Sequence, residues 1–456
     1  MMYYRIYGKA VFPEGIAPGE DKGLSNMITA SRNGEGRPVL RGTALAGVLR
    51  SAFRNLKEEA FAYKWFGEPL DKEHNRSRDS LVYVADMVLN TGTPCDSFNS
   101  EIRTHNLINR HTGAVVNGGL FSLEAYPPST SGDFLLYLKS CGDAHGDDEF
   151  ACVLGNVLGD TLYLGGNRNR GVGRMMIGNL VVSKFDTSTK DGMANWLNVR
   201  YADRKGEFGT YSGEELVLKP SGAALSINVE MQIPRGEDIV VGYGTSVANL
   251  QSEPQFVIKA DGKRYWKIPG SSIRGVFRSW MNRLAARDGK VLADSHENWV
   301  QKKDLNGDKI GHAFVPKERW ETYQCKHGEK RIEDPIMDLF GTLFRRGRIF
   351  FSDAYSVAEA KDSDTQLRKH VAVDRFSGGA NDGAGALFSN KVLVGGTKFT
   401  MQVSIEKPSA DEKKWLLQTF NAMNLGVISF GSSKASGLLE VTNMDEVEAV
   451  LTKEAV

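Results

Sequence analysis

Cysteine is scarce in this 456-residue chain, and its four cysteines show no paired spacing (Cys95, Cys141, Cys152 and Cys325). This pattern excludes a disulfide-stabilised secreted fold and favours a reducing, cytoplasmic location. No apolar run approaches the roughly 20 residues that a membrane-spanning helix needs. The N-terminal stretch MMYYRIYGKA also has no apolar core of the kind found in signal peptides. We therefore expect no membrane among the partners of this protein.

Excess charge of either sign is also absent, because the formal net charge is +1. A near-neutral chain does not coat DNA along its whole surface, although local basic grooves remain possible. Glycine is abundant: 49 residues, or roughly 11%, compared with about 7% in ordinary proteins. These glycines cluster in short loops and not in low-complexity linkers, so we interpret them as backbone positions with specific roles.

One stretch occurs twice. Residues 41–54 (RGTALAGVLRSAFR) recur as residues 269–282 (PGSSIRGVFRSWMN), and the apolar residues of both copies fall at helical spacing. Each copy predicts a loop that enters an amphipathic helix, with Thr43 or Ser271 as the capping residue. Free amides at the helix start, with Arg50 or Arg278 two turns later, predict a phosphate site. The alternative is a capped core helix whose arginines are only solvated. Five residues recur at a constant offset of 228 (270 − 42): Gly42, Gly47, Val48, Arg50 and Ser51.

The repeat extends along most of the chain, so each half should be one domain. The order strand, helix, strand, strand, helix, strand in each half predicts a ferredoxin-like α+β fold. We place the domains at 1–210 and 211–456, with an insertion at about 287–334 in the second. The matched strands are 2–11 and 223–233, the strands before Asp86 and Asp353, and 133–139 and 398–405; the later helices are 147–158 and 410–424. The other matches are Trp65-Phe66-Gly67 with Leu339-Phe340-Gly341, His105 and Arg110 with His370 and Arg375, and Gly165, Arg168 and Gly171 with Gly431, Lys434 and Gly437.

The insertion contains two weak metal-binding patterns. DLNGDKIG (304–311) resembles a calcium loop, but Lys309 and Val315 replace its glycine and its bidentate glutamate. We favour an Asx-rich turn at this position. His312, Cys325 and His327 lack the fourth ligand that a structural zinc site requires.

No nucleophile motif stands out in the sequence. GSSIRG lacks the G-K-[ST] ending of a P-loop, and GNRNRGVG precedes a strand where a dinucleotide motif precedes a helix. What remains is a set of glycine-rich loops with isolated cations, which predicts sequence-independent contacts with a nucleic-acid backbone. The alternative is that these loops are only tight turns. The cations are Arg41, Arg168, Arg170, Arg174, Arg274 and Lys434.

These motifs, in this order, resemble the RAMP superfamily of CRISPR effector proteins. FVIKADGKRYWKIPGSSIRG (256–275) and DTLYLGGNRNRGVG (160–173) are especially similar to backbone subunits of type III complexes. The resemblance implies two ferredoxin-like (RRM-like) RAMP domains, which bind CRISPR RNA as guide, target single-stranded RNA and other effector subunits. Residues 105–121 and 370–388 would be thumb hairpins that splay a base pair of the guide–target duplex. The residues assigned to RNA binding are Arg41, Gly42, Thr43, Arg50, His105, Arg110, Arg168, Arg170, Gly270, Ser271, Ser272, Arg274, Arg278, His370, Arg375 and Lys434.

Active members of this family carry an Asp between the first strand and the first helix. It supports cleavage of target RNA that depends on Mg²⁺ or another divalent metal. Counting back from the two helix starts places Asn26 and Pro254 at this position. Asn is a neutral and weaker metal ligand. The first half is therefore inactive, or uses Asp21, or carries an engineered Asp-to-Asn change, and the second is inactive unless Glu253 serves.

Two other functions fit parts of the sequence. One is a guide-RNA processing ribonuclease of the same superfamily, with His105 or His370 as general base. The other is a tandem RNA-binding module unrelated to CRISPR. That module would be expected to have aromatic-rich strands for base stacking, and we find no such pattern.

Overall fold

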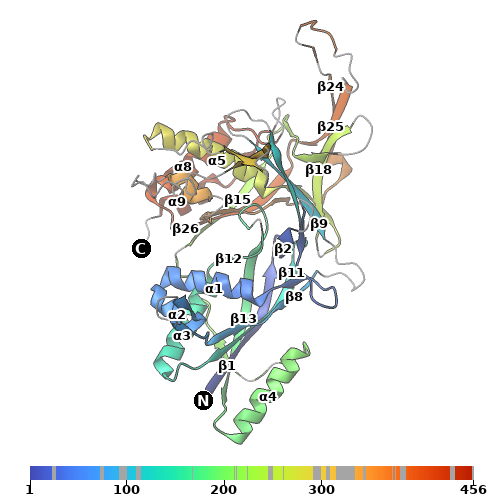
Figure 1. Ribbon diagram of the computed structural model, residues 1–456. Helices are drawn as coiled ribbons and strands as arrows, with labels where there is room; N and C mark the ends of the chain where they lie inside the picture. The colour runs from blue at the N-terminus through green and yellow to red at the C-terminus, as the bar shows by residue number, and fades with distance from the viewer. Residues whose placement is uncertain are drawn as a thin grey trace. The chain divides into compact units, whose positions relative to one another are not determined.

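The computed structural model describes residues 1–453 except for 23–26, 72–75, 92–99, 109–114, 167, 210, 212, 223, 245–249, 260, 291–298, 304–308, 315–333, 342–345, 372, 375, 381–386 and 432–436. The chain forms two compact units (Figure 1). The first unit comprises Met1–Ala224 with Val257–Arg264, and the second comprises Leu225–Phe256 with Tyr265–Val456.

The first unit is built on an antiparallel sheet with the strand order β12-β13-β1-β11-β8-β4. β1 lies in the middle and pairs antiparallel with β11 on one side and β13 on the other. Ile6, Ala10 and Phe12 of β1 are buried in the main core of this unit. The strands are β1 (Met2–Phe12), β4 (Val39–Leu40), β7 (Val82–Val84), β8 (Met87–Asn90), β11 (Thr130–Lys139), β12 (Leu162–Tyr163), β13 (Arg174–Asp186) and β14 (Glu214–Leu216).

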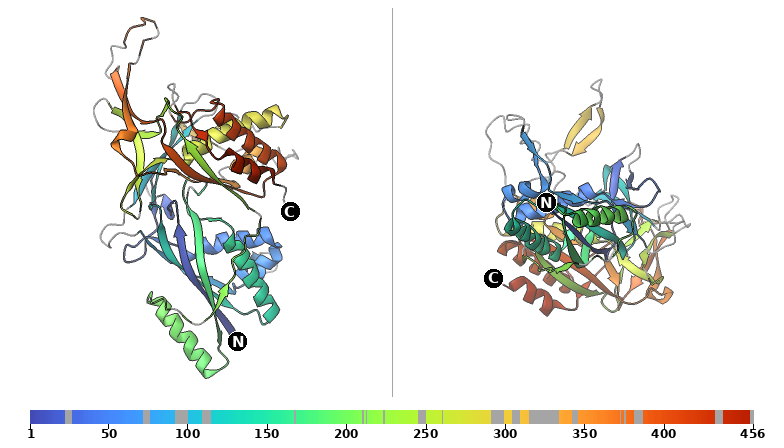
Figure 2. Two further views of the ribbon diagram at one scale, coloured as in Figure 1. Left: turned by 180° about the vertical axis from the view of Figure 1, so that it is seen from behind. Right: turned by 90° about the horizontal axis from the view of Figure 1, so that it is seen from below.

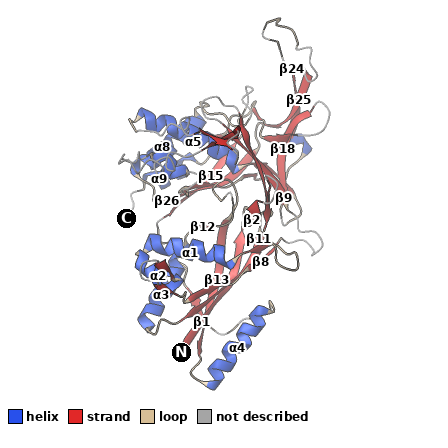
Figure 3. Cartoon of the chain, in the orientation of Figure 1, coloured by secondary structure: helices blue, strands red, loops and turns tan. Residues whose placement is uncertain are grey.

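Helices cover both faces of this sheet. Helix α1 (Gly42–Leu56), α2 (Glu59–Phe66) and α3 (Ala144–Gly159) lie on one side of it, and α4 (Lys190–Arg204) lies on the other (Figures 1 and 3). The view from behind also shows the strands between α4 and the group of α1, α2 and α3 (Figure 2, left). Leu45, Leu49 and Phe53 of α1 recur at helical spacing and enter the core.

A smaller sheet of the first unit has the strand order β2-β3-β10-β9. β9 and β10 form a hairpin, and β3 runs parallel to β10. The bounds are β2 (Gly19–Lys22), β3 (Met27–Ala30), β9 (Glu101–Ile108) and β10 (Val115–Ala125), with a separate pair β5 (Glu68–Asp71) and β6 (Arg76–Arg78).

The second unit repeats this plan with one continuous sheet, in the order β16-β25-β18-β19-β23-β26-β15-β27. Hairpin β24–β25 extends beyond the rest of the unit (Figure 1). The strands are β15 (Ala224–Gln232), β16 (Asp238–Ile239), β17 (Gly242–Gly244), β18 (Leu250–Ile258), β19 (Arg264–Ile268), β22 (Ile349–Phe351), β23 (Ala354–Ser356), β24 (Thr365–Val371), β25 (Leu387–Val394), β26 (Lys398–Glu406) and β27 (Glu440–Val441). The helices are α5 (Gly270–Arg287), α7 (Pro335–Phe340), α8 (Ala410–Asn424) and α9 (Met444–Thr452), with a short 3-10 helix at Asp362–Asp364.

The predicted α+β class is confirmed, and most predicted elements are present. The helix expected at 410–424 has those bounds, and the two copies of the repeated stretch are α1 and α5. Helices α2, α4, α7 and α9 were not predicted. Within the insertion, the described residues form an antiparallel pair of strands, β20 (Trp299–Lys303) and β21 (Lys309–Phe314). Strand β21 begins at Lys309 of the calcium-like segment. Residues 304–308, Cys325 and His327 lie outside the described residues.

The matched glycines have a backbone reason. Gly67 and Gly341 end α2 and α7 with φ of +82° and +81°, which favours glycine strongly over other residues. In the closing loops, Gly173 and Gly437 both have positive φ, and the carbonyls of Leu164 and Phe430 lie where a Cβ would be.

These contacts correct one predicted match. Gly437 corresponds to Gly173 and not to Gly171, because Gly173 and Gly437 accept from the amides of Leu164 and Phe430 respectively. The closing loop of the first unit is therefore two residues longer between its matched glycines than the loop of the second (173 − 165 compared with 437 − 431). Across the described parts of both units, no helix is long and apolar enough to cross a membrane.

Candidate nucleic-acid interface

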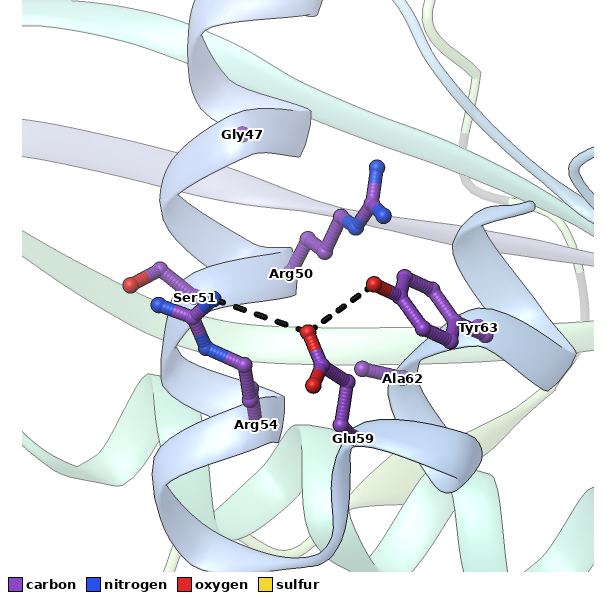
Figure 4. A pocket seen from close by; sticks show the side chains of 7 residues that line it. All are labelled: Gly47, Arg50, Ser51, Arg54, Glu59, Ala62 and Tyr63. Carbon is purple, nitrogen blue, oxygen red and sulfur yellow. Dashed lines mark hydrogen bonds and ion pairs between the residues drawn. The ribbon is translucent and has the colours of Figure 1, made fainter. Parts of the chain in front are cut away.

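A cavity of about 250 Å³ opens between α1 and α2 of the first unit (Figure 4). Gly47, Arg50, Ser51 and Arg54 line it from α1, at a spacing that places all four on one helix face. Three of these, Gly47, Arg50 and Ser51, belong to the set that the sequence repeats. The other lining residues come from α2: Glu59, Ala62 and Tyr63.

The polar groups of this pocket leave it with net positive charge. Glu59 lies between Arg54 and Tyr63: it accepts a hydrogen bond from the Tyr63 hydroxyl at 2.9 Å and pairs with Arg54 at 3.8 Å (Figure 4). This hydrogen bond raises the pKa of Tyr63. The guanidinium of Arg50 lies 5.0 Å from the centre of the Tyr63 ring. Two guanidinium groups against one carboxylate make the pocket suited to an anion that accepts hydrogen bonds.

Gly47 and Gly275 occupy equivalent positions inside α1 and α5. Both are exposed, and nothing lies within 4 Å of the place where a Cβ would be. Glycine inside a helix costs about 1 kcal/mol relative to alanine. Packing within the described residues therefore does not explain the glycine in either helix.

The second unit retains only part of this face. Arg278 and Ser279 of α5 correspond to Arg50 and Ser51, but Asn282 replaces Arg54. Arg274, which we predicted to bind RNA, is only 7% exposed and donates a hydrogen bond to the carbonyl of Phe340. Because this bond ties α5 to the end of α7, Arg274 is a structural residue. Its burial argues against the RNA contact predicted for Arg274.

The helix starts differ from the sequence prediction. The N-cap residues are Arg41 and Pro269, and neither Thr43 nor Ser271 caps its helix. A carboxylate from the strand region accepts the first helix amide in each unit: Asp86 from Gly42 at 2.7 Å, and Asp353 from Gly270 at 2.8 Å. A negative charge therefore already occupies each helix start. The first amide of each helix is therefore not free, which argues against the predicted phosphate site at the helix starts and leaves the helix face that carries Gly47 and Gly275 as the candidate.

Two pairs of aromatic rings mark the predicted thumb hairpins. His105 faces Phe121 across β9 and β10, with ring centroids 5.3 Å apart. His370 faces Phe388 across β24 and β25 in the same way, at 5.1 Å. In the first unit, Arg170 of the closing loop lies 5.9 Å from the Phe121 ring, and burial lowers the pKa of its guanidinium. The structure thus places His105 and Arg170 near the same ring.

The strand register corrects the position equivalent to Asn26. Met27, the first residue of β3, pairs with Ser122, the residue after Phe121. Leu250, the first residue of β18, pairs with Ser389, the residue after Phe388. Met27 and Leu250 are therefore equivalent, so the counterpart of Asn26 is Asn249 and not Pro254. Pro254 instead lies inside β18 and pairs with Gly242.

The same two halves are found by comparison with known families. A family model for the RAMP superfamily matches residues 18–176 and 254–438. The chain belongs to the RAMP superfamily. A search of curated proteins found no match. Each matched RAMP region includes one copy of the repeated helix and one aromatic hairpin, whereas α4 lies between the two regions.

The remaining predicted residues of this RAMP protein fall into two groups. Arg168 lies half-buried in the loop between β12 and β13, and the Ser272 amide donates to the carbonyl of Pro269. Asp21 lies in β2. Four predicted site residues lie outside the described residues: Asn26, Arg110, Arg375 and Lys434. Within the described ranges, no group of three or more His, Cys, Asp or Glu side chains could hold a metal ion.

Proposed function

We propose that this RAMP protein is a backbone subunit of a type III CRISPR ribonucleoprotein, which binds guide RNA and target RNA for antiviral defence. The observation that carries the proposal is the repeated helix face. Gly47 with Arg50 on α1 and Gly275 with Arg278 on α5 are the same residues at the same spacing, one set in each matched region. An open backbone beside an arginine suits a phosphodiester chain.

Each unit is proposed to be a ferredoxin-like RAMP domain. The order β13-β1-β11-β8 in the first unit has its counterpart in β27-β15-β26-β23 of the second. Both orders place the first of these strands (β1 or β15) beside the third (β11 or β26) and the last (β13 or β27). Two helices precede the second strand (α1 and α2, or α5 and α7), and one follows the third (α3 or α8). Each domain is proposed to contribute one such phosphate-binding face to guide binding.

Guide binding follows from the charge balance of the pocket. A phosphate group that enters between Arg50 and Arg54 accepts hydrogen bonds from both guanidinium groups and from Ser51. The Glu59 carboxylate then has to turn away from the bound phosphate. If it stays, repulsion between the two negative charges weakens phosphate binding. Such contacts involve no base edges, so they hold any guide sequence with similar strength.

Target cleavage is not supported by the residues present. A divalent ion on a phosphodiester needs hard anionic oxygen ligands. Asn26 and Asn249 offer neutral amide oxygens at the two equivalent positions. These donors do not fit Mg²⁺ well. We therefore infer that this form binds target RNA and cuts it slowly or not at all. We also propose that the hairpins β9–β10 and β24–β25 act as the thumbs.

The test replaces the repeated arginines. Arg50→Ala with Arg278→Ala removes two phosphate contacts, so guide affinity should fall for every sequence and the slope of log K against log salt should drop by roughly two units. The measurement is filter binding of two unrelated guide RNAs at several salt concentrations. Arg283→Ala is the matched control, because Arg283 is exposed on α5 away from Arg278. An unchanged slope in the double variant would remove this helix face from RNA binding.

A further inference from the structure

Helix α4 is an addition to the first unit that the family match leaves out. It lies between the two matched regions and covers the sheet face opposite α1 and α3 (Figure 1). Its inner side is firmly attached. Asp203 forms a buried ion pair with Arg5 at 2.7 Å and accepts from the Tyr137 hydroxyl at 2.6 Å. Trp196 stacks on Tyr3 with ring centroids 4.9 Å apart. The helix is therefore a fixed part of the fold.

The outer flank of α4 carries a row of exposed apolar side chains. Met193, Leu197 and Tyr201 are 43%, 58% and 62% exposed. They are spaced four residues apart, so they lie one above the other along the helix. Single exposed apolar side chains are ordinary, but a continuous row of three large ones marks an interaction surface. The attachment of α4 depends on its other side, so folding does not require this row.

The exposed charges of α4 nearest the row are cationic. Lys190 and Arg204 are exposed at its two ends, and the Lys205 ammonium lies 4.5 Å from the centre of the Tyr201 ring. Asp203 is turned inward onto Arg5. Asp191 lies about 120° around the helix from Leu197, at 100° per residue. The row is thus an apolar strip with cationic ends, and its complement is apolar with acidic flanks.

Two other occupants fit less well. A second copy of α4 would bring cations together. Lys190 would meet Arg204 in an antiparallel pair, and each would meet its own copy in a parallel pair, so both arrangements are repulsive. Single-stranded RNA binds along basic grooves with aromatic platforms. Here two of the three side chains, Met193 and Leu197, are aliphatic and lie on a convex helix.

We propose that the outer flank of α4 docks an amphipathic helix of a partner protein, whose apolar row is bordered by Asp and Glu residues. Side chains spaced three and four residues apart on that helix would contact Met193, Leu197 and Tyr201. This interface does not depend on RNA binding by the helix face of α1. It gives the first unit a contact surface for which the second unit has no equivalent among its described residues.

The experiment uses the full chain in its native cells, with a photo-cross-linking residue introduced as Leu197→p-benzoylphenylalanine. Mass spectrometry should identify one cross-linked segment with an apolar row and acidic flanks. Lys190→Glu with Arg204→Glu should lower the adduct yield about tenfold, equivalent to roughly 1.4 kcal/mol. Reversing the partner's acidic residues to Lys should restore the yield.

The controls separate docking from misfolding. The same probe at Asn195, about 160° around the helix, should give no adduct. The charge-reversed variant should keep its melting temperature, because both cations are exposed. Adducts with RNA or with a second copy of this chain would overturn the proposal, as would no adduct or a yield that charge reversal leaves unchanged. Guide RNA in the same preparations reports separately on the proposed function.

Discussion

At the scale of single residues, Gly47 and Gly275 show most clearly the difference between a glycine that the fold requires and one that it does not. Gly47 has a helical backbone and empty space where a Cβ would be, whereas Gly42, five residues earlier, would place its Cβ 2.2 Å from the carbonyl oxygen of Val84. The fold therefore requires Gly42 but not Gly47. Arg41 illustrates the same distinction, because it pairs with Asp86 at 3.2 Å and helps to hold the helix start.

Gly47→Ala should raise the free energy of unfolding by about 0.5–1 kcal/mol, because alanine is the better helix former and meets no neighbour. The added methyl group should lower guide affinity, since it stands where the RNA backbone would approach. Denaturant unfolding and filter binding measure the two effects. Asn195→Ala on the exposed side of α4 is the control, which should stabilise the helix without changing guide affinity. A variant that is more stable and binds guide RNA as well as the parent would assign Gly47 no role in binding.

At the scale of elements, the two hairpins share a pattern that neither strand shows alone. Each pairs a histidine with a phenylalanine across the strands, directly beside the start of a parallel strand, β3 or β18. In the second hairpin, Val371 and Leu387 form a cross-strand pair and are 51% and 55% exposed. Exposed apolar pairs on a projecting hairpin are suited to insertion between bases.

Replacing residues 107–119 with a two-residue Asn-Gly turn should shorten the first hairpin and keep its pairing from Leu120–Asn106 to Ala125–Glu101. Guide binding should be largely unchanged, because the α1 face is intact. One target-strand base near the first domain should lose its unpaired reactivity in chemical probing of the guide–target complex. The hairpin would not be a thumb if the shortened protein still left that base reactive.

At the scale of the whole molecule, the repeat places equivalent strand starts, Met27 and Leu250, in both units. Asn26 precedes Met27 in the sequence, and Asn249 precedes Leu250. Met27 and Leu250 each pair with the serine that follows the hairpin phenylalanine of their unit. Two units with the same arrangement predict two equivalent positions on a bound target RNA. The chain should therefore gain two cleavage sites, one per unit, when a carboxylate is restored at each position.

Asn26→Asp restores one anionic oxygen at nearly constant volume, so it should switch on Mg²⁺-dependent cleavage at one position of the target. Asn249→Asp should add a second cut, and the double variant should make both. The assay is a labelled target RNA with the assembled complex, with and without chelator. Strong cleavage by the parent that survives Asp21→Ala would contradict the inference, and so would inert Asp variants that still bind target.

The sequence by itself determined the repeat, the α+β class, the helices that carry Arg50 and Arg278, and the family. These features depend on local periodicity and on residues close together in the chain. Helix α4 could not be predicted in this way. Its inner side contains Trp196, Arg200 and Asp203, which pack on a polar and aromatic sheet face and give no apolar period.

Only the tertiary structure decided which distant groups meet. The carboxylates of Asp86 and Asp353 reach the first amides of α1 and α5 across long stretches of chain, which no spacing rule indicates. The counterpart of Asn26 was misplaced for a related reason. The chain from Met27 to Gly42 advances 15 residues, but from Leu250 to Gly270 it advances 20, so counting back from the helix fails. Strand register, set by hydrogen bonds between strands, restores the match because it does not depend on loop length.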